Sequence, residues 1–477
     1  MSQVEKIEVS YNKNGGLIKA SPNIFKLIRE NFSIKNPVYQ MRRFAPRLYA
    51  ITPSGAFQIG LWYEIEFYLN SLNIPIDIQK TEEFEENLRP QIFVDKISTI
   101  DGFTYYDYQE DTIKEFLIHG RGISILPTAA GKSLCIAGLC KTLLDNNPKS
   151  KILIIVPNAS LLNQLHISLE GEYNLPFSTR WGDGKTPDLT KNILISNSQM
   201  LVSDIKTTLT IVQNYDYVII DEVHTLGEKK NKINKIIQNI KTPNKFGLTG
   251  TLPDSLLANW NIIGKVGGIV YEKSSYEIRE QGTASDVEVR AVYIKYKDSP
   301  VLIPTHNRPT ANYDAEIEFI YNNSKRNDFI AKLVSKLNGN CLIIVDRKIH
   351  GHLLYDCIQS YNKKVFFVQG STDTDERIEI QNLLEKENNI ACIAMSKIFS
   401  TGINIKNLHY AIFVGIGKST VKVCQSIGRT MRKHESKEKA IIYDFFDNLS
   451  YSKEHFKKRV KIYKKQKIDF SITEYKL

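Results

Sequence analysis

The chain has 477 residues, more than a single hydrophobic core organises, and typical domain sizes suggest about three domains. Apolar residues make up 42% and charged residues 24%, as in ordinary folded proteins, and the net charge of +11 favours a polyanionic partner without identifying it. No apolar run approaches the ~18 residues of a membrane span. The six cysteines form no Cys-x-x-Cys pair, so we expect reduced thiols, no zinc site, no membrane and a cytoplasmic location.

Residues 1–95 are predicted to form a small α+β module. Ile7 and Val9 alternate with charged residues, which indicates a strand, and Ser21 before Pro22 is typical of a capped helix start. A second helix is expected over about 61–72. The acidic run 82–86 is expected to begin the linker to the next domain.

Three arginines of this module stand among aromatic residues, namely Arg42, Arg43 and Arg47. They can contact the backbone of a nucleic acid, because phosphate contacts require only exposed basic side chains. A solvated surface explains them equally well.

From about residue 96 the pattern changes to buried β-branched runs separated by helical segments, which indicates parallel sheets covered on both faces. The chain is therefore predicted to hold two α/β lobes, over 96–284 and 285–450, followed by a basic tail over 451–477. The tail can form a basic amphipathic helix that lies on nucleic acid or on the second lobe. The strands are expected over 123–126, 152–156, 193–196, 217–221 and 246–249, then 341–345, 365–368, 390–394, 410–414 and 440–443.

The first expected strand of this series leads into a phosphate-binding loop. Small residues connect the strand to a helix that starts at Gly131-Lys132-Ser133. In such a loop the backbone N–H groups face an anion, the lysine reaches the outer phosphates and the serine hydroxyl binds Mg²⁺. The alternative is an ordinary buried strand–turn–helix. The expected cradle consists of Thr128, Ala129, Ala130, Gly131, Lys132 and Ser133.

Downstream, Asp221, Glu222 and His224 follow a buried strand, and ligands bind at the carboxyl ends of parallel strands. Asp221 would bind Mg²⁺, and Glu222 would position and deprotonate a water molecule. His224 would connect the state of the nucleotide to a neighbouring loop, with Thr249 and Thr251 as its contacts toward the second lobe. A strand that ends in an acidic turn is the alternative.

Upstream of the cradle, Gln109 offers both a donor and an acceptor, which matches the edge of an adenine base. A glutamine at the start of a helix, with no ligand, is the simpler explanation. In the second lobe, Arg429 and Arg432 share one helical face and would act as arginine fingers; a salt-bridged basic helix is the alternative. The segment 400–404 would sense both the nucleotide and a strand phosphate.

Read together, these stretches resemble the motifs of superfamily 2 helicases of the DExH kind. The resemblance covers roughly 100–450. Three positions depart from the pattern of that superfamily, namely Leu126 and Ala129 in the cradle and Asn404 where many members carry Asp. The matching segments are 108–109, 127–133, 156–158, 196–199, 221–224, 249–251, 343–347, 401–404 and 425–432.

The resemblance implies two tandem RecA-like lobes that bind ATP and Mg²⁺ together. It assigns Gln425 to catalysis, and Gly402 and Asn404 to the nucleotide. It further implies strand contacts, mostly to phosphates, from Pro157, Asn158, Gln199, Arg347 and Thr401.

Within the superfamily, the phrases at 399–403, 406–409 and 428–434 resemble the UvsW-type group of phage recombination helicases. That resemblance implies a monomeric ATP-driven motor acting on branched or forked DNA, with branch migration, fork regression and removal of RNA–DNA hybrids, inside the host cytoplasm if a phage encodes it. A double-strand DNA translocase or an RNA helicase with the same core stays open, as does a non-catalytic nucleic-acid scaffold.

Overall fold

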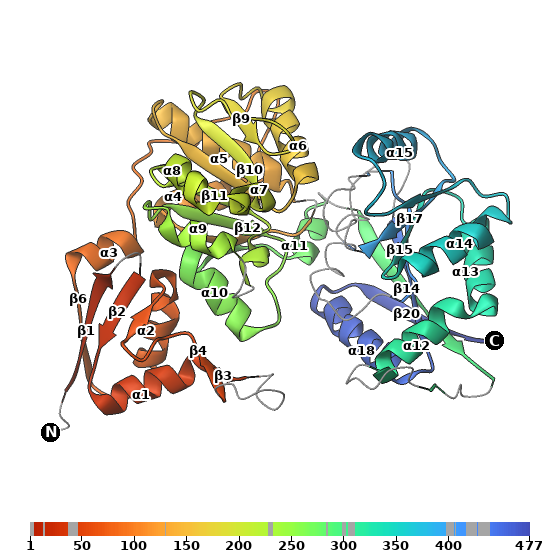
Figure 1. Cartoon of the computed structure of the whole chain (residues 1–477), viewed down its shortest axis with the longest axis horizontal. Coiled ribbons are helices and arrows are strands. Elements are labelled where there is room, and N and C mark those ends of the chain that lie inside the picture. Colours follow the sequence, from red (N-terminus) through yellow and green to blue (C-terminus); the bar gives the residue numbers. More distant parts are fainter. Residues whose placement is uncertain are drawn as a thin grey trace. The chain divides into compact units, whose positions relative to one another are not determined.

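The computed structural model describes residues 4–12, 15–36, 46–128, 130–227, 232–282, 285–297, 302–303, 311–396, 405, 407–415, 427 and 439–477. The chain divides into two compact units (Figure 1). Unit 1 comprises 1–126 with 131–273, and unit 2 comprises 127–130 with 274–477. None of the described helices is long and apolar enough to cross a bilayer.

Unit 1 begins with an α+β module around a four-stranded sheet of order β5-β2-β1-β6. Its core is apolar and includes Trp62 and Phe84, whose rings lie edge to face 5.6 Å apart. The Ser21 hydroxyl caps α1 by accepting from the Ile24 N–H at 3.5 Å, as predicted. Its elements are β1 (Glu5–Asn12), β2 (Gly15–Lys19), α1 (Pro22–Asn31), β3 (Ser33–Lys35), β4 (Arg47–Tyr49), β5 (Ala56–Phe57), η2 (Ile59–Leu61), α2 (Trp62–Asn70), β6 (Ile76–Lys80) and α3 (Glu82–Leu88).

The acidic run at 82–86, expected to be a linker, is helix α3 instead. Thr81 caps it, and acidic residues in its first turn favour the positive end of the helix dipole. Phe84 and Leu88 are buried in the core of the module. Charge alone therefore misled the prediction, because the two apolar residues four positions apart face inward.

The module packs tightly on helix α10 (Leu256–Val266) of the same unit. A Cβ atom on Gly60 would come within 2.1 Å of the Ile263 carbonyl oxygen, and one on Gly264 within 2.7 Å of the Gln58 Cβ. Trp260 of α10 packs against the core of the module, with its ring 5.5 Å from that of Phe32. Module and lobe thus share one packed interface, which agrees with their grouping in one unit.

The first lobe contains a parallel seven-stranded sheet of order β13-β7-β12-β11-β8-β10-β9. The five predicted strands are confirmed, and the short edge strands β9 and β13 are added. The strands are β7 (Gly122–Ile125), β8 (Ile152–Val156), β9 (Ser178–Trp181), β10 (Ile193–Asn197), β11 (Tyr217–Asp221), β12 (Lys245–Thr249) and β13 (Ile269–Glu272). The other elements are α4 (Asp107–His119), α5 (Lys132–Asn146), α6 (Ala159–Ile167), η3 (Ser168–Glu172), α7 (Ser198–Ser203), α8 (Ile205–Val212), η4 (Val223–Gly227) and α9 (Ile233–Asn239).

Unit 2 contains a second parallel seven-stranded sheet, of order β16-β17-β15-β18-β19-β14-β20. Two tandem parallel-sheet lobes are the predicted fold class, which is confirmed. The strands are β14 (Asp286–Lys295), β15 (Cys341–Val345), β16 (Val365–Val368), β17 (Ala391–Met395), β18 (Tyr410–Phe413), β19 (Lys439–Asp447) and β20 (Asp469–Lys476). The helices are α11 (Ser275–Glu280), α12 (Ala311–Asn322), α13 (Ser324–Lys336), α14 (Lys348–Gln359), α15 (Thr374–Lys386) and α18 (Ser450–Lys465).

The segment 451–477, expected to be a basic tail, is built into this lobe. Its helix α18 buries Arg459 and Tyr463, and both bind the buried carboxylate of Asp444. The Arg459 guanidinium donates to the two Asp444 oxygens at 2.9 and 2.8 Å, and the Tyr463 hydroxyl donates at 2.7 Å. Strand β20 then pairs with β14 at the edge of the sheet. The second lobe therefore continues to Leu477.

Candidate active site

The phosphate loop connects β7 to α5, and its last residue, Gly131, has φ +76° and precedes the first residue of α5. This left-handed conformation favours glycine, and a Cβ at Gly131 would also lie 2.4 Å from the Gln109 Nε2. Lys132 occupies the first position of α5, and its Nζ donates to the Leu126 carbonyl at 3.4 Å. The N–H groups of the first helical turn are thus placed to face an anion. Ala129 lies outside the described residues.

Gln109 lies beside this loop, as the contact at Gly131 requires. It is 3% exposed, and its Oε1 accepts from the Tyr106 N–H at 3.0 Å in a capping box of α4. The helix-start explanation is therefore correct for the Oε1 atom. The ring of Tyr106 is half exposed and stacks on Tyr108, which is buried. The contact of Gln109 with adenine stays a prediction.

Asp221 is the last residue of β11, and Glu222 follows it with φ +51°, a left-handed conformation that is uncommon for residues other than glycine. The Asp221 Oδ1 accepts from the Glu222 N–H at 2.9 Å. Burial, and after it the Glu222 charge, raises the pKa of Asp221 to about 6, although Lys132 and His224 oppose the shift. Lys132 follows β7 and Asp221 ends β11, and these strands lie on either side of β12 in the sheet.

His224 connects Glu222 to the end of the neighbouring strand β12. Its Nδ1 lies 3.2 Å from the Glu222 Oε2 and 2.9 Å from the Thr249 Oγ1. Thr249 is fully buried, and its hydroxyl also donates to the Thr251 carbonyl at 3.0 Å. The predicted partnership of His224 with the 249–251 segment is present within unit 1. The proposed relay to the second lobe stays a prediction.

These groups meet at one edge of the sheet because β12 lies between β7 and β11. The Leu126 N–H, at the start of the phosphate loop, donates to the Thr249 carbonyl at 2.9 Å. The phosphate loop therefore follows β7, Thr249 ends β12, and the Asp221 and Glu222 carboxylates lie at the end of β11. These three strands are adjacent and parallel. This is the edge at which open α/β sheets bind ligands.

The donor set fits Mg²⁺. The half-buried Asp221 carboxylate, whose pKa is raised, gains from a nearby cation, and the half-buried Ser133 supplies a second oxygen from the first turn of α5. Within the described ranges no three His, Cys, Asp or Glu side chains gather as a metal site. Mg²⁺ suits this arrangement, because it is usually held by one or two protein oxygens together with phosphates and water.

The residues of the first lobe that are expected to contact nucleic acid follow two adjacent β-strands, β8 and β10. Asn158 caps α6, its Oδ1 accepting from the Leu161 N–H at 3.0 Å, while its buried Nδ2 has no hydrogen-bond partner among the described residues. The Ser198 hydroxyl donates to the Pro157 carbonyl at 3.0 Å, and the next residue, Gln199, is exposed. The structure thus brings Pro157, Asn158 and Gln199 together beyond the ends of β8 and β10.

The remaining basic candidates are placed differently. The Arg47 Nε donates to the Ser33 hydroxyl at 2.8 Å, so this half-buried side chain also holds β4 against β3. Arg347 precedes α14, is 53% exposed and lies 3.6 Å from the Asp314 carboxylate. Several candidates lie outside the described residues, namely Arg42, Arg43, Thr401, Gly402, Asn404, Gln425, Arg429 and Arg432.

One polar pair of unit 2 was missed. Asp346 follows β15 and accepts a hydrogen bond from the Ser396 hydroxyl, which follows β17. These strands are neighbours, so the pair marks the carboxyl edge of the second sheet. The same signal that selected Asp221, a polar residue directly after a buried strand, would have found both.

Two families match the chain. Residues 102–254 match "Type III restriction enzyme, res subunit", and residues 325–434 match "Helicase conserved C-terminal domain". The chain is also similar to the ATP-dependent DNA helicase uvsW of Enterobacteria phage T4, with 29% identity over 90% of this chain and 88% of that protein. The chain is a superfamily 2 helicase of the DExH kind.

More distant relatives of this helicase share its core. The helicase/translocase subunit XPB of Drosophila melanogaster is 22% identical over 68% of this chain, which spans 41% of that protein. The DNA-bound restriction-modification enzyme LlaBIII has a TM-score of 0.58 at 14% identity, over 86% of this helicase and 34% of that chain. Dbp5 of S. cerevisiae, bound to RNA and ADP BeF3, has 0.55 at 15%, over 78% and 89%. The two structures support the fold.

Proposed function

We propose that this helicase uses ATP to remodel branched DNA, by branch migration, fork regression and unwinding of RNA–DNA hybrids. The observation that carries the ATPase is the convergence of Lys132, Asp221 and the Glu222–His224–Thr249 chain at one sheet edge. The DNA substrate is supported by the similarity to a phage DNA helicase over 90% of the chain.

Each residue of the site has a distinct task in this proposal. Lys132 and the first turn of α5 bind the outer phosphates of ATP, and Ser133 and Asp221 hold Mg²⁺, which neutralises phosphate charge. Glu222 orients and deprotonates the attacking water, and His224 fixes the Glu222 carboxylate through the contact at 3.2 Å. Arg429, Arg432 and Gln425 would add transition-state contacts, and Gly402 and Asn404 would bind the nucleotide.

Nucleic acid would be held mainly through phosphates. Pro157, Asn158 and Gln199 are assigned to one strand, and the buried Asn158 Nδ2 is a donor available for such a contact. Thr401 and Arg347 are assigned to the second lobe, and Arg42, Arg43 and Arg47 to the module. Phosphate contacts make binding salt-dependent and tolerant of sequence. A monomeric motor in the cytoplasm stays a prediction.

The test is ATP hydrolysis measured with single-stranded, duplex, forked and four-way DNA and with an RNA–DNA hybrid, followed by strand-displacement assays. We expect the greatest stimulation by forked and four-way DNA. Lys132→Ala should abolish hydrolysis, and the half-buried Lys141→Ala on the same helix serves as control, because Lys141 contacts only Asp145 in the described residues.

Full hydrolysis by Lys132→Ala would end the motor hypothesis. Equal stimulation by linear duplex would favour a double-strand translocase; the XPB relative is named a helicase/translocase subunit. Stimulation by RNA alone would favour an RNA helicase, and DNA binding without hydrolysis would leave a scaffold.

A further inference from the structure

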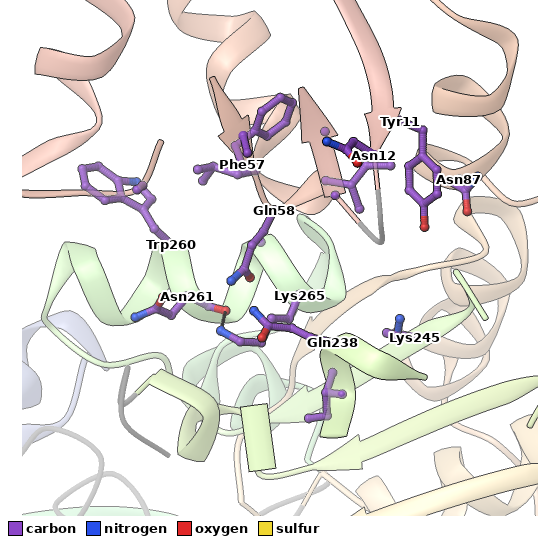
Figure 2. Close-up of a pocket in the computed structure, with 18 of the residues that line it drawn as sticks. Tyr11, Asn12, Phe57, Gln58, Asn87, Gln238, Lys245, Trp260, Asn261 and Lys265 are labelled. Carbon is purple, nitrogen blue, oxygen red and sulfur yellow. Dashed lines mark hydrogen bonds between the residues drawn. The ribbon is translucent and has the colours of Figure 1, made fainter. Parts of the chain in front are cut away.

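Unit 1 contains a cavity of about 520 Å³ between the N-terminal module and the first lobe. Figure 2 shows Tyr11, Phe57 and Gln58 of the module on one wall, and Trp260 and Asn261 of helix α10 on the other. Cavities of a few hundred Å³ that combine aromatic rings with a few polar groups are typical small-molecule sites.

The cavity is lined by three buried cations and by no Asp or Glu from the described part of the chain. Arg121, Lys245 and Lys265 are 3%, 7% and 6% exposed. Each binds backbone carbonyls rather than carboxylates. The Arg121 guanidinium donates to three carbonyls at 2.9–3.1 Å, the Lys245 Nζ to that of Ile240 at 3.2 Å, and the Lys265 Nζ to that of Asn261 at 2.6 Å.

The cavity retains hydrogen-bonding capacity. An ammonium group has three donors, and each lysine makes one hydrogen bond to the described residues. The buried Gln58 Oε1 makes none there. Burial lowers the pKa of Lys265 to about 8, and burial with the Arg121 charge lowers that of Lys245 to about 7. Buried cations are ordinarily paired, so an anion would complete this set.

We propose that this cavity binds a phosphate-bearing ligand of nucleotide size, with its phosphate on Lys245, Lys265 and Arg121. The base would lie near Trp260 and Phe57, with the Gln58 amide within the same walls. Aromatic faces stack bases, and cations bind phosphate. The ligand is either a free nucleotide or the phosphorylated end of a DNA strand, which present the same chemistry.

The site is distinct from the proposed ATP site. Arg121 directly precedes β7, and Lys245 is the first residue of β12. The phosphate loop and Thr249 stand at the opposite ends of these two strands. A ligand in the cavity therefore binds at the other edge of the same sheet and contacts the module as well.

The test uses the full chain carrying Lys132→Ala, which weakens the ATP site. Binding of dAMP and of deoxyadenosine is measured by equilibrium dialysis. We expect one dAMP per chain, with deoxyadenosine at least about tenfold weaker, because a charge-assisted hydrogen bond contributes roughly that factor. Adding Lys245→Met and Lys265→Met should weaken dAMP binding by about tenfold or more, whereas Lys464→Met with Lys465→Met, two exposed lysines of α18, should not change it.

Removal of two poorly solvated charges should raise thermal stability, so loss of binding is separable from unfolding. Lys265→Met alone is the second variant, and a smaller loss is expected from it. Absence of dAMP binding, equal binding of deoxyadenosine, or dAMP binding unchanged by the methionine substitutions would each overturn the proposal. Single-stranded DNA with a 5′-phosphate or a 5′-hydroxyl then distinguishes the sources. If DNA with a 5′-phosphate binds more tightly than DNA with a 5′-hydroxyl, and the methionine substitutions abolish that difference, the ligand is the end of a strand. If the two DNAs bind equally, the ligand is the free nucleotide.

Discussion

At the scale of single residues, the Thr249 hydroxyl joins two functional segments of the first lobe. It bonds His224 at 2.9 Å and the Thr251 carbonyl at 3.0 Å, and His224 in turn contacts Glu222. A threonine is suited to this position, because its branched side chain packs in a strand while its hydroxyl both donates and accepts.

We predict that Thr249→Val retains ATP binding and loses about tenfold to a hundredfold in kcat, because the position of Glu222 then depends on His224 alone. Steady-state hydrolysis and nucleotide-binding titrations measure the two effects. Thr208→Val is the matched control, since Thr208 is also buried and its hydroxyl donates to the Leu201 carbonyl at 2.9 Å, outside the candidate site. Equal kcat in both variants would show that the hydroxyl of Thr249 does not position the base.

At the scale of elements, a buried ion pair between α18 and β19 holds the helix on the sheet. Asp444 is fully buried and accepts from both Arg459 and Tyr463. Removing one partner of a buried ion pair is strongly destabilising, because it leaves the other charge without compensation.

Asp444→Asn is therefore expected to lower the stability of the second lobe by about 3–5 kcal/mol. The exposed pair Lys458–Glu454, at 2.8 Å on the same helix, provides the control, and Lys458→Met should change stability by less than about 1 kcal/mol. Urea unfolding followed by circular dichroism measures both. A loss no greater than that of the control would mean that the buried cluster does not hold α18 in place.

Two lysines at the module interface, one at the start of β12 and one in the last turn of α10, have lowered pKa values. The pKa of Lys245 is lowered from 10.5 to about 7, and that of Lys265 to about 8. Between these values and 10.5 the unfolded chain binds more protons than the folded chain, so this contribution to stability rises with pH and is lost as pH falls toward 7.

The expected result is that the difference in unfolding free energy between the wild type and the variant with Lys245→Met and Lys265→Met shrinks from pH 7 to pH 10. Each pKa unit corresponds to about 1.4 kcal/mol. Taking the difference cancels tyrosine and cysteine titrations common to both proteins. A difference that does not change with pH would show that both lysines titrate normally.

Many of the helices and strands could be predicted from the sequence. Near-continuous apolar runs placed β8, β11, β15 and β16 at their observed bounds, because buried parallel strands have few polar residues. The edge strands β9, β13 and β20 escaped prediction, and β20 is mostly exposed, so its pattern resembles a polar tail. Among the site residues, Lys132, Asp221 and Glu222 were readable from their positions after strands. The capping role of Gln109 is a local contact and agrees with the helix-start alternative, whereas the cavity cations depend on tertiary contacts that no local pattern encodes.

At the scale of the whole molecule, the module and the first lobe form one unit. Each part of this unit contains a tryptophan whose fluorescence can report its unfolding. Trp62 lies in the module core, Trp260 at the interface and Trp181 in the first lobe. Because the interface is packed closely at Gly60, a single cooperative transition is expected for both parts.

In a variant that retains only Trp62, and in one that retains only Trp181, with phenylalanine at the other positions, the urea midpoint from fluorescence should equal that from circular dichroism of the same variant. Adding Gly60→Ala should separate the two midpoints, because its Cβ would meet the Ile263 carbonyl at 2.1 Å. Gly171→Ala is the control, as no atom lies within 4 Å of its Cβ position. Separate midpoints in the parent variants would mean that the module unfolds independently.

The pairing of β14 with β20 affects how this protein emerges from the ribosome. Glu288 pairs with Asp469, so an inner strand of the second sheet is synthesised well before its neighbour exists. During that interval the N–H and C=O groups along one side of β14 have no neighbouring strand to pair with. Such open edges can pair with strands of other chains and lead to aggregation. Strand β20 covers this side of β14 and then forms the edge of the sheet itself.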